Sequence, residues 1–115
     1  ELTARLYALE ALLEKGAGLI DAARTEVELT RDSAAAASLT VAAAKALAQE
    51  FAVEIASGVL ELAGASATDR KYGLDRHWRN VRVHSLHDPA RWKNVHLGNN
   101  TLHGTRPPPR LGVLL

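Results

Sequence analysis

Two long stretches of this chain repeat apolar residues at intervals of three and four positions, which is the spacing of one face of an α-helix. The first stretch covers about residues 2–29, and the second covers about residues 33–63. Alanine and leucine supply most of the apolar residues, whereas aromatic residues make up only 4% of the chain. A sheet requires more β-branched and aromatic side chains than this, so we expect an all-α fold.

The first helix carries one continuous apolar stripe, while most of its charged residues fall off that stripe. The stripe consists of Leu2, Leu6, Leu9, Leu13, Ala17, Ile20, Ala23 and Val27. Gly16 and Gly18 lie within this helix, where each glycine destabilises it by about 1 kcal/mol relative to alanine. These glycines indicate either a bend or a close approach of a second helix.

The second helix is rich in alanine and has clear signals at both ends. Asp32 and Ser33 are both favourable N-cap residues, and Gly64 is the kind of residue that commonly follows a helix. Its apolar stripe consists of Leu39, Ala43, Leu47, Phe51, Ile55, Val59 and Leu62. The alanines at 34–37 and 42–44 leave a slim surface on which we expect a neighbouring helix to pack tightly.

Two shorter helices are predicted after a turn of small residues at 64–68. The third spans about residues 74–86, with Leu74, Trp78 and Val81 facing inward. The fourth begins with Asp88 as N-cap and Pro89 at the first helical position, which is a favourable helix start.

The four helices together predict an up-down helical bundle that occupies residues 1–104. We expect the fourth helix to end near Gly98 or Gly104, because glycine often follows the last helical residue. Residues 105–115 contain three consecutive prolines and are predicted to form an extended tail. The chain starts at Glu1, inside a helical pattern, and contains no methionine, so we expect it to be a fragment of a longer protein.

Composition excludes several classes of protein. Cysteine is absent, which excludes disulfides, thiolate metal sites and a cysteine nucleophile. The net charge of +1 produces no strong field toward nucleic acid or anionic lipid. No apolar run reaches the ~20 residues of a membrane span, and the first residues do not form a signal peptide pattern. We expect a cytoplasmic protein that binds neither nucleic acid nor membrane.

The segment His84-Ser85-Leu86-His87-Asp88 is the strongest candidate for chemistry. Its two histidines are three positions apart, so one continuous helix would place them on the same face. With Asp88 they are able to ligate a metal ion, although a helix start at Asp88 would turn the chain between the ligands. The alternatives are histidines that form structural hydrogen bonds at a helix junction, and histidines that act as acid, base or hydrogen-bond donor.

Two further segments allow more than one interpretation. Residues 75–82 alternate arginines with Trp78, which suits a nucleic-acid surface, a contact to a cofactor phosphate, or an arginine-rich helix paired with its acidic neighbours. The small-residue turn at 64–68 offers backbone N–H groups and hydroxyls to a phosphate, but most such turns only end a helix.

These residues together resemble a known family. The helix at 43–63, the Gly64-Ala65 turn and residues 72–80 resemble the C-terminal helical domain of acyl-CoA dehydrogenases. Residues 74–80, 84–93 and 96–99 are similar to one branch, the reduced-flavin-dependent monooxygenases of the dibenzothiophene monooxygenase and sulfur-acquisition types.

The resemblance implies the C-terminal domain of a longer, tetrameric flavoprotein whose flavin lies between subunits. In this branch a separate flavin reductase supplies reduced flavin, which reacts with O₂ and oxygenates a small organosulfur or aromatic substrate. A histidine beside the flavin ring would stabilise the oxygenated flavin by hydrogen bonding. His87 is the first choice for this role and His84 the second, while Asp88 would orient a histidine or cap the last helix.

The resemblance also implies a cofactor contact and two alternative functions. The family's Gly-Gly turn meets the flavin; here it is Gly64-Ala65, and Ser66 adds a hydroxyl. Loss of the second glycine favours FMN over FAD, and no metal is expected. Asp88 stands where the dehydrogenases carry a glutamate base, so the first alternative is an acyl-CoA dehydrogenase that uses FAD and Asp88. The second alternative is a non-catalytic helical oligomerisation module.

Overall fold

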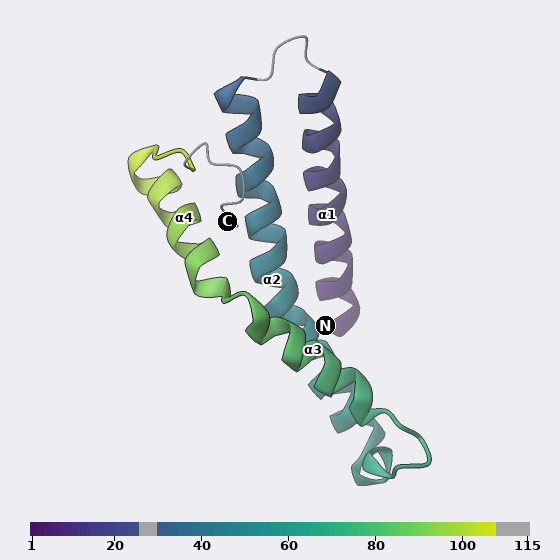
Figure 1. The fold of residues 1–115 in the computed structure, drawn as a ribbon. Coiled ribbons are helices and arrows are strands. Elements are labelled where there is room, and N and C mark those ends of the chain that lie inside the picture. The colour runs from purple at the N-terminus through teal and green to yellow at the C-terminus, as the bar shows by residue number, and fades with distance from the viewer. Residues whose placement is uncertain (26–29, 108–115) are drawn as a thin grey trace.

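A computed structural model describes residues 1–25 and 30–107, and the regular secondary structure of this part of the chain is helical throughout. Its elements are α1 (Leu2–Thr25), α2 (Arg31–Ala63), the short 3₁₀ helix η1 (Ala65–Thr68), α3 (Asp75–His87) and α4 (Ala90–His103). α1 and α2 form an antiparallel hairpin, and α3 and α4 return one after the other along α2 (Figure 1). The expected all-α bundle of two long and two shorter helices is confirmed.

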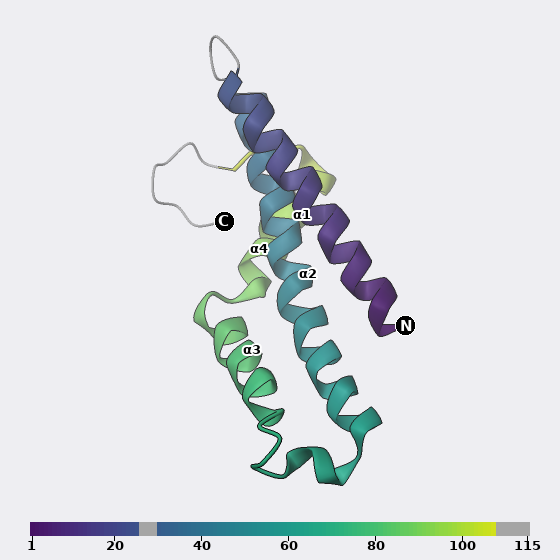
Figure 2. The same cartoon turned by 90° about the vertical axis from the view of Figure 1, so that its right-hand side faces the viewer.

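The long helix α2 is the centre of this arrangement. It contacts α1 on one side and both α3 and α4 on another, as the view from the side shows (Figure 2). Because α2 packs against neighbours in more than one direction, its buried surface is not a single stripe.

α1 runs without a break through both of its glycines. Gly16 is buried, and a Cβ atom there would lie 3.6 Å from Val41 Cγ2 and 3.8 Å from Thr40 Cγ2 of α2. These are ordinary van der Waals distances, so Gly16 lies in the packed interface between α1 and α2 and does not mark a bend. Of the expected stripe, Leu9 and Ala23 are buried, whereas Leu6, Leu13 and Ile20 are exposed and Val27 lies outside the described residues.

The start of α2 differs from the sequence prediction. Thr30 is the N-cap: its backbone is extended, and its Oγ1 accepts a hydrogen bond of 3.1 Å from the backbone N–H of Ser33. The prediction of Asp32 or Ser33 as N-cap is wrong because a cap must reach the N–H three residues further on, and Thr30 does so. Asp32 instead forms a 2.5 Å ion pair with Arg106, beyond the end of α4.

The buried residues of α2 are small ones. They are Ala42, Ala44, Ala46 and Gln49, whereas Leu47, Val59 and Leu62 of the predicted leucine stripe are exposed. Alanine lets neighbouring backbones approach on both sides, so the surface with the smallest side chains is covered most completely. The expectation of tight packing is confirmed at Ala42 and Ala44 but not at residues 34–37, none of which is buried. The predicted stripe is wrong at Leu47, Val59 and Leu62.

The helix α2 ends at Gly64, as the sequence predicted. Gly64 adopts φ 76° and ψ 179°, and its N–H donates to Glu61 O at 3.3 Å.

The helix α3 is joined to α2 by a side-chain hydrogen bond: Trp78 Nε1 on α3 donates to Ser57 Oγ on α2 at 3.0 Å. This bond, together with the half-buried Leu74 and Val81, holds α3 against α2. Trp78, which was also predicted to face inward, is 37% exposed, and its indole N–H contacts α2 as a donor.

The junction between α3 and α4 consists of Asp88 and Pro89. Pro89, with φ −62° and ψ 123°, occupies the N-cap position of α4, so the prediction of Asp88 as N-cap is one residue early. The side chain of Asp88 is instead bound by lysines of α2 and α4. α4 continues through Gly98 and ends at Gly104, whose N–H donates to Asn100 O at 2.8 Å.

The structure describes only part of the predicted extended tail at residues 105–115. Residues 104–107 have no helix or strand, and residues 108–115 lie outside the described part of the chain. Among the helices that are described, none combines the length and the apolar character required to cross a membrane.

Candidate functional site

The predicted histidines lie at the end of α3, where the chain turns into α4 beside the middle of α2. His84 and His87 belong to the same helix, three residues apart, and both side chains are exposed. Asp88 follows directly and ends α3 with an extended backbone, φ −139° and ψ 101°. The structure therefore brings these three predicted residues into one short segment.

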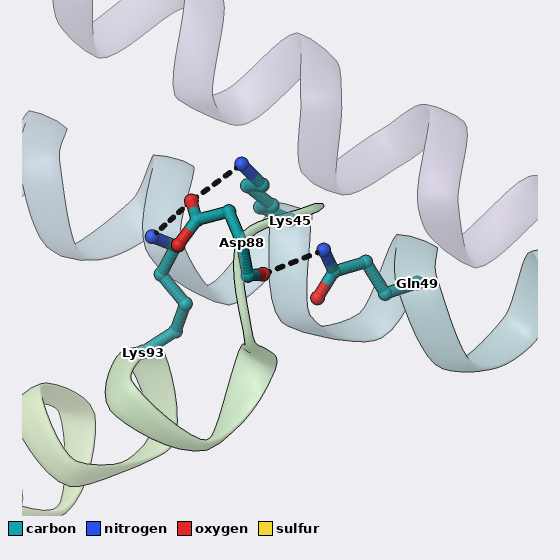
Figure 3. Close-up of polar contacts among 4 residues, drawn as sticks. All are labelled: Lys45, Gln49, Asp88 and Lys93. Carbon is teal, nitrogen blue, oxygen red and sulfur yellow. Dashed lines mark hydrogen bonds and ion pairs between the residues drawn. The ribbon is translucent and has the colours of Figure 1, made fainter. Parts of the chain in front are cut away.

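Asp88 is held by three side chains from two other helices (Figure 3). Its Oδ2 accepts hydrogen bonds from Lys45 Nζ of α2 at 2.6 Å and from Lys93 Nζ of α4 at 2.7 Å. Its backbone oxygen accepts a 2.9 Å hydrogen bond from Gln49 Nε2, also of α2. We call this cluster of Lys45, Gln49, Asp88 and Lys93 the Asp88 anchor.

Two of the three charges of the Asp88 anchor, those of Asp88 and Lys93, are largely shielded from water, whereas the Lys45 side chain is 36% exposed. The side chain of Lys93 is 1% exposed and that of Asp88 is 18% exposed. The hydrogen bond from Lys45, followed by that from Lys93, lowers the pKa of Asp88 from 3.8 to about 2. Asp88 is therefore ionised at neutral pH, and it compensates a buried ammonium group that would be strongly unfavourable without a partner.

His84 borders a groove between α2 and α3. The groove has a volume of about 350 Å³ and is lined by Lys45, Ala48, Gln49, Ala52, Asn80, Val81, His84 and Ser85. Gln49, only 8% exposed, has a side-chain oxygen that accepts no hydrogen bond from the described residues. A buried amide oxygen of this kind usually binds water or a ligand donor.

Neither histidine ring is fixed by its own contacts. Within residues 1–25 and 30–107, the rings of His84 and His87 form no hydrogen bond and no ion pair. The same part of the chain holds no group of three histidine, aspartate or glutamate side chains placed to bind a metal ion. Both rings are free to donate to or accept from a bound molecule.

The predicted cofactor turn lies elsewhere. Gly64, Ala65 and Ser66 are exposed at the far end of α2, away from the α3–α4 junction (Figure 1). Gly64 follows Gln49 by 15 residues along α2, which corresponds to roughly 22 Å of helix. One copy of the chain therefore does not bring the turn together with His84, His87 and Asp88.

The arginines of α3 are partly engaged within the helix. Arg79 Nε forms a 2.9 Å ion pair with Asp75, and this contact lowers the pKa of Asp75. The interpretation of paired surface charges therefore holds for Arg79. Arg82 is one of the residues that line a second groove, which has a volume of about 440 Å³ and lies among α2, α3 and α4.

Sequence reasoning missed the partners of Asp88. Lys45 and Gln49 interrupt an alanine-rich surface four residues apart, which places them one above the other on a helix. The sequence placed both residues off the apolar stripe, and the available signal was this polar pair among the small alanines that are buried. Lys93 gave a weaker signal, because a lysine within a short helix is normally exposed.

The sequence matches the family described as "Acyl-CoA dehydrogenase, C-terminal domain" over residues 1–92. Dibenzothiophene monooxygenase from Rhodococcus erythropolis is 40% identical over 110 residues, which are 95% of this chain and 26% of that protein. The probable FMNH2-dependent monooxygenase SfnC of Pseudomonas putida is 35% identical over 105 residues, which are 90% of this chain and 27% of that protein.

A solved structure has the same fold. TdsC from Paenibacillus sp. A11-2, in a complex with FMN and indole, superposes with a TM-score of 0.88 at 32% identity. The match covers 96% of this chain and 28% of that chain. This chain thus spans about a quarter of the length of the relatives it matches.

Proposed function

This chain belongs to the acyl-CoA dehydrogenase C-terminal domain family, and we propose that its full-length protein is a flavin-dependent monooxygenase. The proposed reaction uses reduced FMN and O₂ to oxygenate a small organosulfur or aromatic substrate, and a separate flavin reductase supplies the reduced flavin. Support comes from the similarity to a dibenzothiophene monooxygenase and to a probable FMNH2-dependent monooxygenase over at least 90% of this chain.

The protonation state of the Asp88 carboxylate favours a monooxygenase over a dehydrogenase. The resemblance places Asp88 where the dehydrogenases have a catalytic base, and a base must accept a proton from its substrate. Hydrogen bonds from Lys45 and Lys93 keep the pKa of Asp88 at about 2, so it is a weak proton acceptor at neutral pH. We therefore propose that Asp88 anchors the site and removes no proton.

We propose His87 as the histidine that would act beside the flavin ring, with His84 as the second choice for the same role. Reduced flavin, when bound, supplies the electrons that activate O₂. The exposed imidazole of His87 has a ring nitrogen free to donate a hydrogen bond to developing negative charge on oxygen. His84 lies one helical turn earlier, at the edge of the groove with Gln49.

The turn at Gly64, Ala65 and Ser66 is the proposed flavin contact, with FMN favoured over FAD. The residues fit this role because they are small and exposed, and a Cβ atom on Gly64 would meet no atom within 4 Å. Since turn and histidines lie apart on one chain, we propose that flavin lies between the turn of one subunit and the histidines of another. The proposed assembly is a cytoplasmic tetramer of a longer chain.

An oxygen-labelling experiment on the full-length protein tests this function. The flavin-free protein is loaded anaerobically with reduced FMN and mixed with ¹⁸O₂ and a substrate, dibenzothiophene or indole. We expect one ¹⁸O atom in the product by mass spectrometry and a loss of product in His87→Ala. Oxidation of the flavin without a labelled product from either substrate would contradict the proposal, and bleaching of oxidised FAD by an acyl-CoA would favour the dehydrogenase.

A further inference from the structure

The residue after His87 is fixed more firmly than His87 itself. Lys45 and Gln49 of α2 and Lys93 of α4 all bind Asp88, two through its carboxylate and one through its backbone oxygen. Asp88 lies between two helices, where no helical hydrogen bonds hold the backbone. The Asp88 anchor therefore replaces the missing helical restraints at this point of the chain.

Because Lys93 is buried, the Asp88 anchor favours a single position of Asp88 at the junction between α3 and α4. Its ammonium group is almost completely removed from water, and Asp88 is the one carboxylate within 4.0 Å of it among the described residues. A displacement of Asp88 would leave a buried charge without a partner, which is strongly unfavourable. The junction is thus held in the one arrangement that satisfies Lys93.

We propose that Lys45 and Lys93 are positioning residues for His87. They hold Asp88, and Asp88 fixes the main chain on which the His87 ring depends, because no described residue holds that ring directly. This inference rests on the proposed function, in which His87 meets the oxygenated cofactor. Oxygen transfer requires a fixed geometry, since a displacement of about 1 Å can reduce a rate by about a hundredfold.

A double-mutant cycle on the full-length protein tests the inference. The measured quantity is the ratio of oxygenated product to hydrogen peroxide released per reduced FMN consumed. We expect Lys45→Met and Lys93→Met each to lower this ratio by about tenfold or more. In combination with His87→Ala, neither should lower it further, because both act through the same ring. Lys45→Arg, which keeps the charge, should restore most of the ratio.

A second measurement needs neither flavin nor turnover. Hydrogen–deuterium exchange of the flavin-free protein, followed in the peptide covering residues 84–93, should be about tenfold faster in Lys45→Met and Lys93→Met. Peptides from α1 should be unchanged in both variants. Lys15→Met is the matched control: Lys15 is exposed on α1 and forms no ion pair with the described residues, so neither measurement should change.

The outcomes separate this inference from the proposed function. If the wild-type protein transfers no oxygen, the proposed function fails and the positioning role fails with it. If oxygen is transferred and the losses of the lysine and His87 variants multiply, or if exchange at residues 84–93 is unchanged, the positioning role alone is overturned. Should Lys93→Met not fold, Lys45→Met decides, because the Lys45 side chain is 36% exposed.

Discussion

Replacing Gly64 by alanine should destabilise the domain although it causes no clash. A Cβ atom at Gly64 would meet nothing within 4 Å, so the effect comes from the backbone alone. At φ 76° and ψ 179° the residue occupies a region that is essentially restricted to glycine. Forcing an L-residue into it costs about 1–3 kcal/mol. The turn would have to distort or the end of α2 would have to fray.

Gly18→Ala adds the same methyl group and should have the opposite effect. Gly18 lies inside α1 with helical geometry, and a Cβ atom there also meets nothing within 4 Å. Alanine should stabilise the helix by about 1 kcal/mol. The two variants should therefore differ by about 2–4 kcal/mol in the free energy of unfolding of this domain.

Urea unfolding of the flavin-free full-length protein, followed by circular dichroism, measures this difference. Gly64→Asn provides a third variant: asparagine tolerates the ordinary left-handed region, but not a ψ near 180°, so it should not restore stability. A Gly64→Ala protein as stable as the wild type would refute the argument. So would full rescue by Gly64→Asn, which would mean that the turn relaxes at little expense.

Three further predictions follow from individual contacts. Asp88 has a folded-state pKa of about 2, below its ordinary 3.8, so its contribution to stability is complete above about pH 5 and is lost as the pH falls through 2. Asp88→Asn should therefore be less stable than wild type at pH 7, where Lys93 loses its partner, with the gap narrowing toward pH 2 in thermal melts. Trp78→Phe should cost about 0.5–1.5 kcal/mol, and its effect should not add to that of Ser57→Ala, which removes the acceptor of the same hydrogen bond. Thr30→Ala should cost about 1 kcal/mol through loss of the N-cap, measured by urea unfolding, and an unchanged midpoint would show that another residue caps α2.

Local signals predicted the helices well. Glycine at 64 and at 104 ends α2 and α4, and the break between α3 and α4 falls at Asp88 and Pro89, beside the expected place. These features depend on residues a few positions apart, which is the range over which propensity and capping act. The N-cap at Thr30 was missed because three neighbouring residues are all able to cap, and only the backbone decides among them.

Features that depend on distant residues were not predicted. The leucine stripe of α2 pointed to one buried face, but a helix with neighbours on several sides buries its alanines instead. The pairing of Asp88 with Lys45 joins residues 43 positions apart, and no periodicity within either helix reveals it. The family resemblance indicated a candidate segment for the chemistry, whereas the lysines that hold that segment became visible only in three dimensions.

The helix α2 fixes the distance between two parts of the domain, the turn at Gly64 and the Asp88 anchor. The turn at Gly64 is attached to its end and the Asp88 anchor to its middle. An α-helix resists stretching, because every change in its length breaks backbone hydrogen bonds. The spacing between turn and anchor is therefore set by the count of residues in α2. A deletion of one residue between Gln49 and Gly64 would shorten that spacing by about 1.5 Å and rotate the turn by about 100° around the helix axis.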